Sequence, residues 1–159
     1  MKISSSTFDS NQTIPSKYTC DGENINPPLQ IADIPEDAES LVLIVDDPDA
    51  PAGTWTHWTI WNITPHINDI SENSIPNRAS WDPNSPSVPL PAMEGLTDFG
   101  KSGYDGPCPP SGTHRYFFKL YALDTMLDLP PSAKAGDIEK AMKGHILDKA
   151  ELIGLYKRQ

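Results

Sequence analysis

The chain has 159 residues and a formal net charge of −10, with 12 Lys and Arg residues against 22 Asp and Glu residues. A chain this acidic cannot neutralise nucleic-acid phosphates and is repelled by anionic lipid surfaces, so we expect neither as a partner. Its length fits a single domain over residues 1–159, which would bury roughly two thirds of the surface that the unfolded chain exposes.

The sequence contains no apolar segment of the length of a signal peptide or a membrane span, so we expect a cytoplasmic protein with no integral membrane association. Cys20 and Cys108 are its two cysteines. They could form a disulfide, half of a metal site or two buried thiols. Because a cytoplasm is reducing, two free thiols are the expected state.

Two β-strands are expected in the first half of the chain. Residues 40–46 form a continuous apolar run that ends at Asp-Pro, which is typical of a strand buried on both faces. Residues 54–63 are rich in Thr and Trp, and alternation places these side chains on one face: Trp55, His57, Thr59, Trp61 and Ile63. Trp58 and Ile60 then lie on the other face, and large apolar side chains on both faces indicate packed sheets.

Residues 64–103 are polar and rich in Pro and Asn, and neither a helical nor a strand period holds there. We therefore predict one long loop, and loops of this length in a compact domain tend to be functional. Its tryptophan, Trp81, is expected in the core, together with Trp58 and Trp61.

The second half of the chain predicts two further strands and a helix. Residues 114–123 alternate, with His114 and Tyr116 on the same side. Residues 137–143 are expected to form a helix, with acidic residues in the first turn and a glycine directly after the last. Residues 150–156 return to a strand pattern.

Two loops rich in Pro and Gly lead to histidines. Residues 47–51, Asp-Pro-Asp-Ala-Pro, lead to His57, and residues 104–113 lead to His114. A carboxylate beside an imidazole fixes its tautomer and favours the cationic ring, so Asp47 and Asp49 would make both rings cationic near neutral pH. Two such rings predict a binding site for an anion.

Neutral hydrogen-bond donors are expected beside these rings. Backbone N–H groups at Gly106 or Gly112 could bind a phosphate or a carboxylate. A hydroxyl of Tyr104 or Tyr116 could add a further donor.

Other interpretations of the same residues remain open. An Asp before Pro often caps a turn, and a lone histidine in a strand is more often a packing residue than a ligand. Two imidazoles and two carboxylates could hold zinc, but their spacing is not diagnostic. A hydrolase could use His57 with Cys108 or with a metal. Arg115 should point away from the site and bind a loop through a salt bridge.

These segments resemble the phosphatidylethanolamine-binding protein family, in its short bacterial and archaeal branch, also called Raf kinase inhibitor-like. The segment from Asp47 to His57 is similar to the first signature of the family, and Gly103 to Tyr116 is similar to the second. Further similarity runs from Tyr18-Thr19-Cys20-Asp21-Gly22 to Ala150-Glu151-Leu152 and covers nearly the whole chain.

The resemblance implies a mainly β fold with two packed, largely antiparallel sheets and one or two short helices near the C-terminus. It also implies a pocket for phosphate, phosphorylethanolamine or a similar anion. The residues matching the pocket of the family are Asp47, Trp55, His57, Gly106, His114 and Tyr116. Some members of the family are described as inhibitors of kinases or of serine proteases.

The sequence departs from the family pattern at three places. Thr97-Asp98-Phe99-Gly100 differs from the usual motif, and the loop from Ile75 to Pro91 is longer than usual. The sequence ends at Gln159, directly after the last expected strand, where eukaryotic members have a helix that helps to close the pocket. We therefore do not expect kinase regulation by the eukaryotic mechanism.

The leading hypothesis is a non-enzymatic protein that binds a small phosphorylated or carboxylated ligand and regulates a partner protein, such as a protease or a kinase. The predicted ligand-binding residues are Asp47, Asp49, Trp55, His57, Gly106, Cys108, His114 and Tyr116. No catalytic residue, metal or cofactor is assigned, and a homodimer is considered because a symmetric dimer is the commonest form among small soluble homo-oligomers. The alternatives are a serine-protease or kinase inhibitor acting through surface loops, and the hydrolase described above.

Overall fold

The computed structural model describes the chain except residues 77–83 and 85–87. A six-stranded sheet runs through the molecule in the order β2 (Gln12–Thr13), β11 (Ile146–Tyr156), β10 (His114–Leu123), β4 (Ser40–Asp47), β5 (Trp55–Ile63) and β9 (Met93–Glu94). Its strands pair antiparallel, except that β2 and β11 are parallel.

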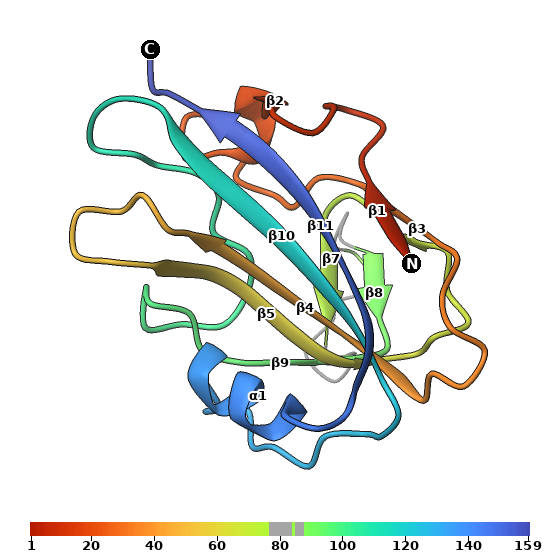
Figure 1. Ribbon diagram of the computed structural model, residues 1–159. Coiled ribbons are helices and arrows are strands. Elements are labelled where there is room, and N and C mark those ends of the chain that lie inside the picture. The colour runs from red at the N-terminus through yellow and green to blue at the C-terminus, as the bar shows by residue number, and fades with distance from the viewer. Residues whose placement is uncertain (77–83, 85–87) are drawn as a thin grey trace.

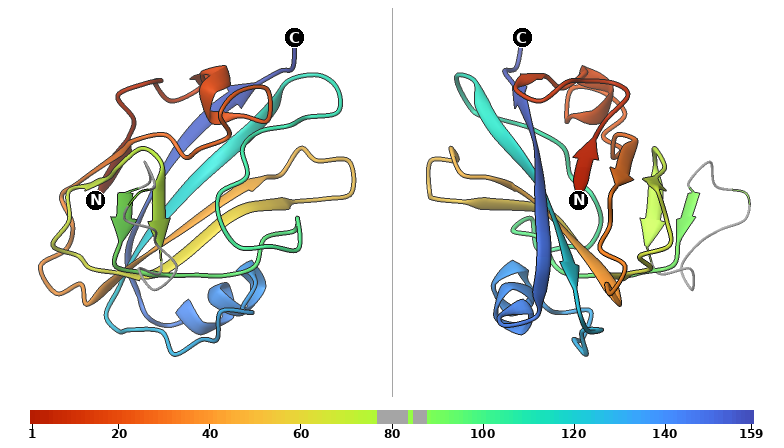
Figure 2. Two further views of the ribbon diagram at one scale, coloured as in Figure 1. Left: turned by 180° about the vertical axis from the view of Figure 1, so that it is seen from behind. Right: turned by 45° about the vertical axis from the view of Figure 1, so that its right-hand side comes forward.

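A smaller sheet packs on one face of the large one, and its strands are β1 (Lys2–Ser4), β3 (Leu29–Ala32) and β6 (Asp69–Ile70). A parallel pair, β7 (Ser74–Pro76) and β8 (Val88–Leu90), lies on the same side (Figure 2). The short helices are a 3-10 turn at Ser16–Tyr18 and α1 (Ala135–Met142), which covers the opposite face of the large sheet. The expected mainly β fold with two packed sheets and a short helix near the C-terminus is confirmed.

The predicted burial of residues 40–46 on both faces is explained by these two layers. Leu41, Leu43 and Val45 enter the main core between the sheets. Val42 and Ile44 enter a second core under α1. A strand covered on both faces needs apolar residues at every position, which is why its sequence shows no alternation.

The alternation expected along β5 is interrupted at His57. Val45 of β4 pairs with Trp58. The next residue of β4, Asp46, pairs with Thr56, so His57 is an extra residue in the ladder, which is a β-bulge. The bulge places both His57 and Trp58 on the inner side of the sheet, where His57 contacts Tyr116 and Trp58 packs in the main core.

A second register shift in β5 separates Ile60 from Ile63. Trp61 therefore packs against α1, whereas Ile63 packs in the main core. The prediction that His57 and Trp61 share a face is wrong, because strict alternation holds only in a strand without bulges. Trp58 and Trp61 are buried as expected, and Trp81 lies outside the described residues.

The prediction of one long loop over residues 64–103 is also wrong for its described part. Strands β6, β7, β8 and β9 lie within it, and β9 forms one edge of the large sheet. Strands of two or three residues are too short to show a period in the sequence. The predicted helix starts two residues earlier than expected and the last strand four residues earlier. No helix among the described residues combines the length and the apolar composition that crossing a bilayer requires.

Candidate ligand-binding site

Three strand ends meet at one end of the large sheet: the last residue of β4, the first residues of β5 and the first residues of β10. A cavity of about 310 Å³ opens there. The residues that line it are Asp47, Ala50, Pro51, Ala52, Trp55, His57, Phe99, Cys108, Pro109, Pro110, His114 and Tyr116. Six of the eight predicted site residues are among them, while Asp49 and Gly106 are not.

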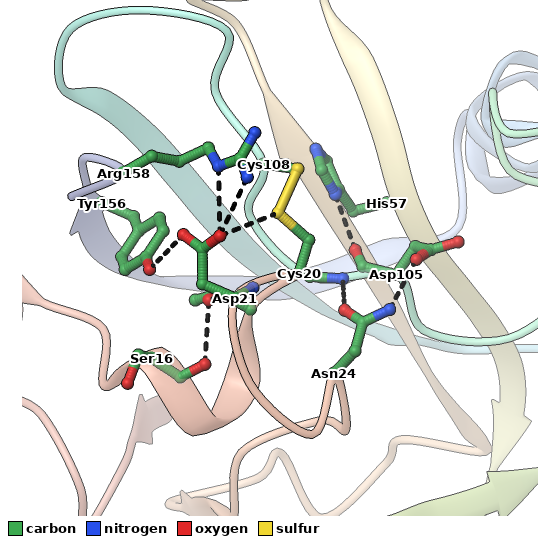
Figure 3. Close-up of a disulfide and its surroundings, with 11 residues drawn as sticks. Ser16, Cys20, Asp21, Asn24, His57, Asp105, Cys108, Tyr156 and Arg158 are labelled. Atoms are coloured by element: carbon green, nitrogen blue, oxygen red, sulfur yellow. Dashed lines mark hydrogen bonds and ion pairs between the residues drawn. A yellow bond between two sulfur atoms is a disulfide. The ribbon is translucent and has the colours of Figure 1, made fainter.

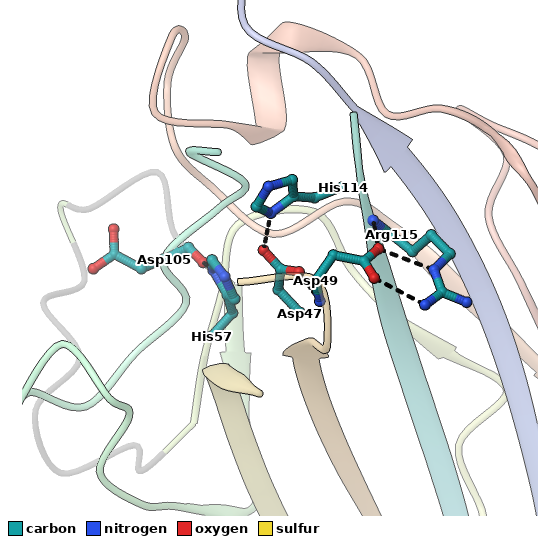
Figure 4. A network of polar contacts seen from close by, with 6 residues as sticks. All are labelled: Asp47, Asp49, His57, Asp105, His114 and Arg115. Atoms are coloured by element: carbon teal, nitrogen blue, oxygen red, sulfur yellow. Dashed lines mark hydrogen bonds and ion pairs between the residues drawn. The ribbon is translucent and has the colours of Figure 1, made fainter. Parts of the chain in front are cut away.

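His114 and Asp47 form a buried pair in the cavity wall. Nδ1 of His114 lies 2.7 Å from Oδ2 of Asp47, and the two side chains point at one another (Figure 4). An ionised carboxylate only accepts hydrogen bonds, so Nδ1 of His114 is the donor. The second nitrogen of this ring, Nε2, remains available to a ligand.

His57 has a different partner from the one that the sequence suggests. Its Nδ1 lies 2.6 Å from the backbone carbonyl oxygen of Asp105, and its ring is 4 % exposed. Burial lowers the pKa of His57 below 6.5, and the hydrogen bond to the Asp105 carbonyl and the charges of the nearby carboxylates oppose this effect without cancelling it. The expectation of two cationic rings is therefore wrong for His57, because a neutral carbonyl does not compensate the burial of a charge.

Tyr116 contributes a buried hydroxyl to the cavity. The residue is 1 % exposed, and its oxygen has no well-formed hydrogen bond to any described residue. Burial and the neighbouring charge of Asp47 raise the pKa of this hydroxyl, so it keeps its proton. A buried hydroxyl without a partner costs free energy, and a bound ligand would remove this cost. The other candidate, Tyr104, already donates to the backbone oxygen of Tyr18.

Asp49 lies outside the cavity. Both of its carboxylate oxygens bind the guanidinium of Arg115, at 2.8 and 2.9 Å, and the pair turns away from the histidines (Figure 4). Hydrogen bonds from Arg115 lower the pKa of Asp49 to about 2. The prediction that Arg115 binds a loop through a salt bridge is thereby confirmed.

Gly106 holds its loop against the segment that contains Asn24. Its N–H donates to Oδ1 of Asn24 at 2.8 Å, so it is not available to an anion. A Cβ atom at this position would collide with the backbone oxygen of Tyr18 and with Cα of Thr19. A glycine is required here because two backbone segments come into contact.

Cys20 and Cys108 form a disulfide (Figure 3). The expectation of two free thiols is wrong, because the two loops that carry them pack together, with the N–H of Cys20 donating to the carbonyl of Pro107. Both cysteine residues are exposed rather than buried. The bond joins the segment after the 3-10 turn to the loop that lines the cavity.

The loop over residues 104–113 is fixed from several directions. The side chain of Asn24 also donates to Oδ1 of Asp105 at 2.8 Å, and Lys101 pairs with the second oxygen of that carboxylate. These contacts hold the Asp105 carbonyl against His57. The contact of Asp105 with His57 could not be predicted from the sequence, since a backbone carbonyl has no side-chain signature, and Asn24 was not predicted either.

Phe99 was likewise not among the predicted site residues. It is 40 % exposed at the cavity mouth, and its ring meets those of Trp55 and His57 edge-on. Its place next to Gly100 in a motif that departs from the family pattern was the available signal. The walls of the cavity are therefore mostly apolar, while its polar atoms come from the histidines, Asp47 and Tyr116.

No group of three or more His, Cys, Asp or Glu side chains in the described part of the chain is arranged to hold a metal ion.

A β-sandwich with a small, mostly apolar cavity at one end of its larger sheet makes that cavity the candidate ligand-binding site. The chain belongs to the phosphatidylethanolamine-binding protein family, whose sequence model matches residues 4–157.

Relatives and solved structures agree with this assignment. The chain is 51 % identical over 158 residues to a UPF0098 protein of Methanothermobacter thermautotrophicus, with 99 % of each chain covered. It is similar in structure to a Chlamydia trachomatis protein described as a candidate homologue of phosphatidylethanolamine-binding protein, with a TM-score of 0.88, 37 % identity and coverage of 99 % and 97 %. It is also similar to Escherichia coli YbcL, described as a new member of the mammalian family, with a TM-score of 0.85, 26 % identity and coverage of 99 % and 98 %.

Proposed function

We propose that the protein binds, without transforming it, a small molecule with a phosphoryl or carboxylate head group and an apolar remainder. The observation that carries this proposal is the pairing of His114 with Asp47 inside the cavity, at 2.7 Å. With Nδ1 of His114 bound to this carboxylate, a ring that carries a proton on each nitrogen offers Nε2–H to an anion. The hydroxyl of Tyr116 is the second donor.

The apolar walls support the second half of the proposal. Trp55, Phe99 and the prolines of the two loops surround the polar floor. A head group that loses water on binding needs polar partners, while the carbon skeleton gains from apolar contact. A phosphate monoester with an aromatic group, such as phenyl phosphate, combines both requirements and serves as the probe.

Titration calorimetry with phenyl phosphate tests the proposal, with benzyl alcohol as the neutral ligand of similar shape. His114→Ala removes a charge-assisted hydrogen bond, and we expect binding to weaken about 10- to 100-fold. His145→Ala is the matched control, because His145 also pairs with a carboxylate, Asp124, but lies exposed and outside the cavity. The proposal fails if phenyl phosphate does not bind, or if both variants bind it as the wild type does.

In the hydrolase alternative Cys108 would be the nucleophile, but its thiol is oxidised in the disulfide. A cysteine in a disulfide has no thiolate, so Cys108 cannot attack a substrate while the bond to Cys20 is intact. The inhibitor alternative depends on the segment 64–103, of which residues 77–83 and 85–87 lie outside the described residues. Replacing residues 77–87 with a Gly-Ser linker of the same length tests it, because β8 is kept, protease inhibition would disappear and binding of phenyl phosphate would persist.

The disulfide bears on the compartment in which the protein works. Disulfides persist in oxidising compartments and are rare in a reducing cytoplasm. A cytoplasmic location therefore requires a cytoplasm that leaves this exposed bond oxidised. Trapping free thiols with a maleimide in rapidly acidified cells measures its state directly: two labelled cysteines indicate a reducing compartment, and none indicates an oxidising one.

A further inference from the structure

We propose that the cavity selects a head group that carries a proton, so that a phosphoryl monoanion binds and a fully deprotonated oxyanion of the same shape, a sulfate ester, is rejected. This inference rests on the proposed function and adds the protonation state of the ligand. His57 is the residue that determines the selection.

The first step is the tautomer of His57. Its Nδ1 lies 2.6 Å from the carbonyl oxygen of Asp105, which can only accept a hydrogen bond. Nδ1 must therefore carry the proton. In a neutral ring the other nitrogen, Nε2, then carries a lone pair and acts as an acceptor.

The second step is the charge of that ring, which depends on every ionisable group around it. The ionisable groups around it are Asp46 and Asp47 on β4, His114 and Tyr116 on β10, and Asp105 on the loop. The three carboxylates are already engaged: Asp46 with Lys119, Asp47 with His114, and Asp105 with Lys101 and Asn24. Burial among aromatic edges outweighs them and lowers the pKa of His57, so its ring is neutral near pH 7.

The third step is the contrast between Tyr116 and His57. The buried hydroxyl of Tyr116 keeps its proton and offers a donor, whereas His57, with its carbonyl partner, offers an acceptor. A ligand that satisfies both must accept a hydrogen bond with one oxygen and donate one with another. A phosphate monoester that keeps one proton does this, because it has both P–O⁻ and P–OH groups.

A sulfate ester has no proton to donate at neutral pH. Its oxygen would face the lone pair of Nε2 in His57, and two acceptors in a buried site repel one another. Sites built to receive a hydrogen bond from a ligand reject analogues that lack the donor far more strongly than apolar sites reject a missing methylene. We expect phenyl phosphate to bind at least about 10-fold more tightly than phenyl sulfate at pH 7.

The two ligands also predict different pH profiles. The second pKa of a phosphate monoester is about 6, so affinity for phenyl phosphate should fall as pH rises above that value. Phenyl sulfate does not titrate between pH 5 and pH 8, so its profile reports the histidines of the protein alone. It should gain affinity at low pH, once His57 is protonated and Nε2 becomes a donor.

The experiment is calorimetric titration of both ligands between pH 5 and pH 8, in buffers of different ionisation enthalpy. At pH 7.5 we expect phenyl phosphate to take up close to one more proton on binding than phenyl sulfate does. In His57→Ala the two ligands should bind with similar affinity, whereas in His114→Ala both should weaken together. If His57→Ala does not fold, the difference in proton uptake between the two ligands on binding to the wild type tests the proposal.

The outcomes separate the two proposals. Equal binding of both ligands by the wild type, equal proton uptake, or discrimination that survives in His57→Ala overturns the selection of a protonated head group and leaves the binding function intact. If neither phenyl phosphate nor phenyl sulfate binds, the binding function itself is overturned. A ¹⁵N resonance of His57 Nε2 typical of an unprotonated nitrogen, which shifts with phenyl phosphate and not with phenyl sulfate, supports the inference independently.

Discussion

The side chains of His114 and Asp47 lie 2.7 Å apart and are 9 % and 5 % exposed. The other oxygen of Asp47 accepts the N–H of Asp49 at 2.8 Å. Asp47 thus fixes the start of β10 and the turn that follows β4 with one carboxylate. Removing Oδ2 leaves the buried Nδ1–H of His114 without its acceptor, and removing Oδ1 leaves the half-buried N–H of Asp49 without one.

We expect Asp47→Asn to lower the free energy of unfolding by about 1–3 kcal/mol, because one amide oxygen cannot replace both carboxylate oxygens. Urea denaturation at pH 7 measures the loss. Asp49→Asn is the control, since its pair with Arg115 is exposed and should change stability by less than about 1 kcal/mol. Equal losses in the two variants would contradict the importance of the buried pair.

The lowered pKa of His57 makes stability depend on pH in one direction. The unfolded chain binds a proton at this residue below about pH 6.5, where the folded state still resists it. The contribution of His57 is therefore constant above pH 6.5, falls as pH decreases towards the lower folded pKa, and is constant again below it. When the pH is lowered from 8 to 5.5, the free energy of unfolding measured by urea denaturation should decrease more for the wild-type protein than for His57→Gln. A larger loss in the variant would reverse the sign of the effect.

The disulfide should contribute strongly to stability because it links residues 88 positions apart. A bond that closes a loop of this length restricts the unfolded chain by about 4–5 kcal/mol in the chain-entropy estimate. We expect the double variant Cys20→Ser, Cys108→Ser to unfold at a much lower urea concentration. Wild-type protein treated with a dithiol should match it, because both sulfurs belong to exposed residues. Unchanged midpoints would show that the native contacts alone hold the two loops together.

Gly106→Ala should destabilise the fold by about 1–3 kcal/mol, since its methyl group meets the backbone of Tyr18 and Thr19. Gly136→Ala is the matched control. A Cβ atom at Gly136 meets nothing within 4 Å, and alanine in a helix is more stable than glycine by about 0.5–1 kcal/mol. The midpoint temperature of thermal unfolding should therefore decrease in Gly106→Ala and increase in Gly136→Ala. A loss of similar size in both would indicate a general effect of the substitution.

The sequence predicted the centre of the fold well, because the strongest signals lie there. Residues 114–123 form β10 with the predicted bounds, and residues 40–46 form most of β4. Pro and Gly mark the ends of these strands, and burial on both faces makes their composition distinctive. The faces of β5 were assigned wrongly, since a bulge leaves no mark in the pattern of hydrophobic residues.

The residues of the candidate site could also be predicted only in part. Asp47, His57 and His114 were grouped because they follow or precede the same kind of loop, and the structure brings them to one cavity. Their partners were not predictable: Asp49 turns to Arg115, and His57 binds a backbone carbonyl. Pairing depends on side-chain direction and on contacts across the chain, neither of which the sequence encodes locally. The binding role of these residues is still a prediction.

The position of β10 between β4 and β11 has a consequence for the order of assembly. The histidine and the carboxylate that face one another in the cavity are 67 residues apart, so neither half of the site can form on its own. Pairings of such long range make folding slow, on the order of milliseconds to seconds. On the ribosome, at about 5–20 residues per second, Asp47 is made several seconds before His114. During that interval β4 can pair with β5 but not yet with β10, so one edge of β4 is without its neighbouring strand.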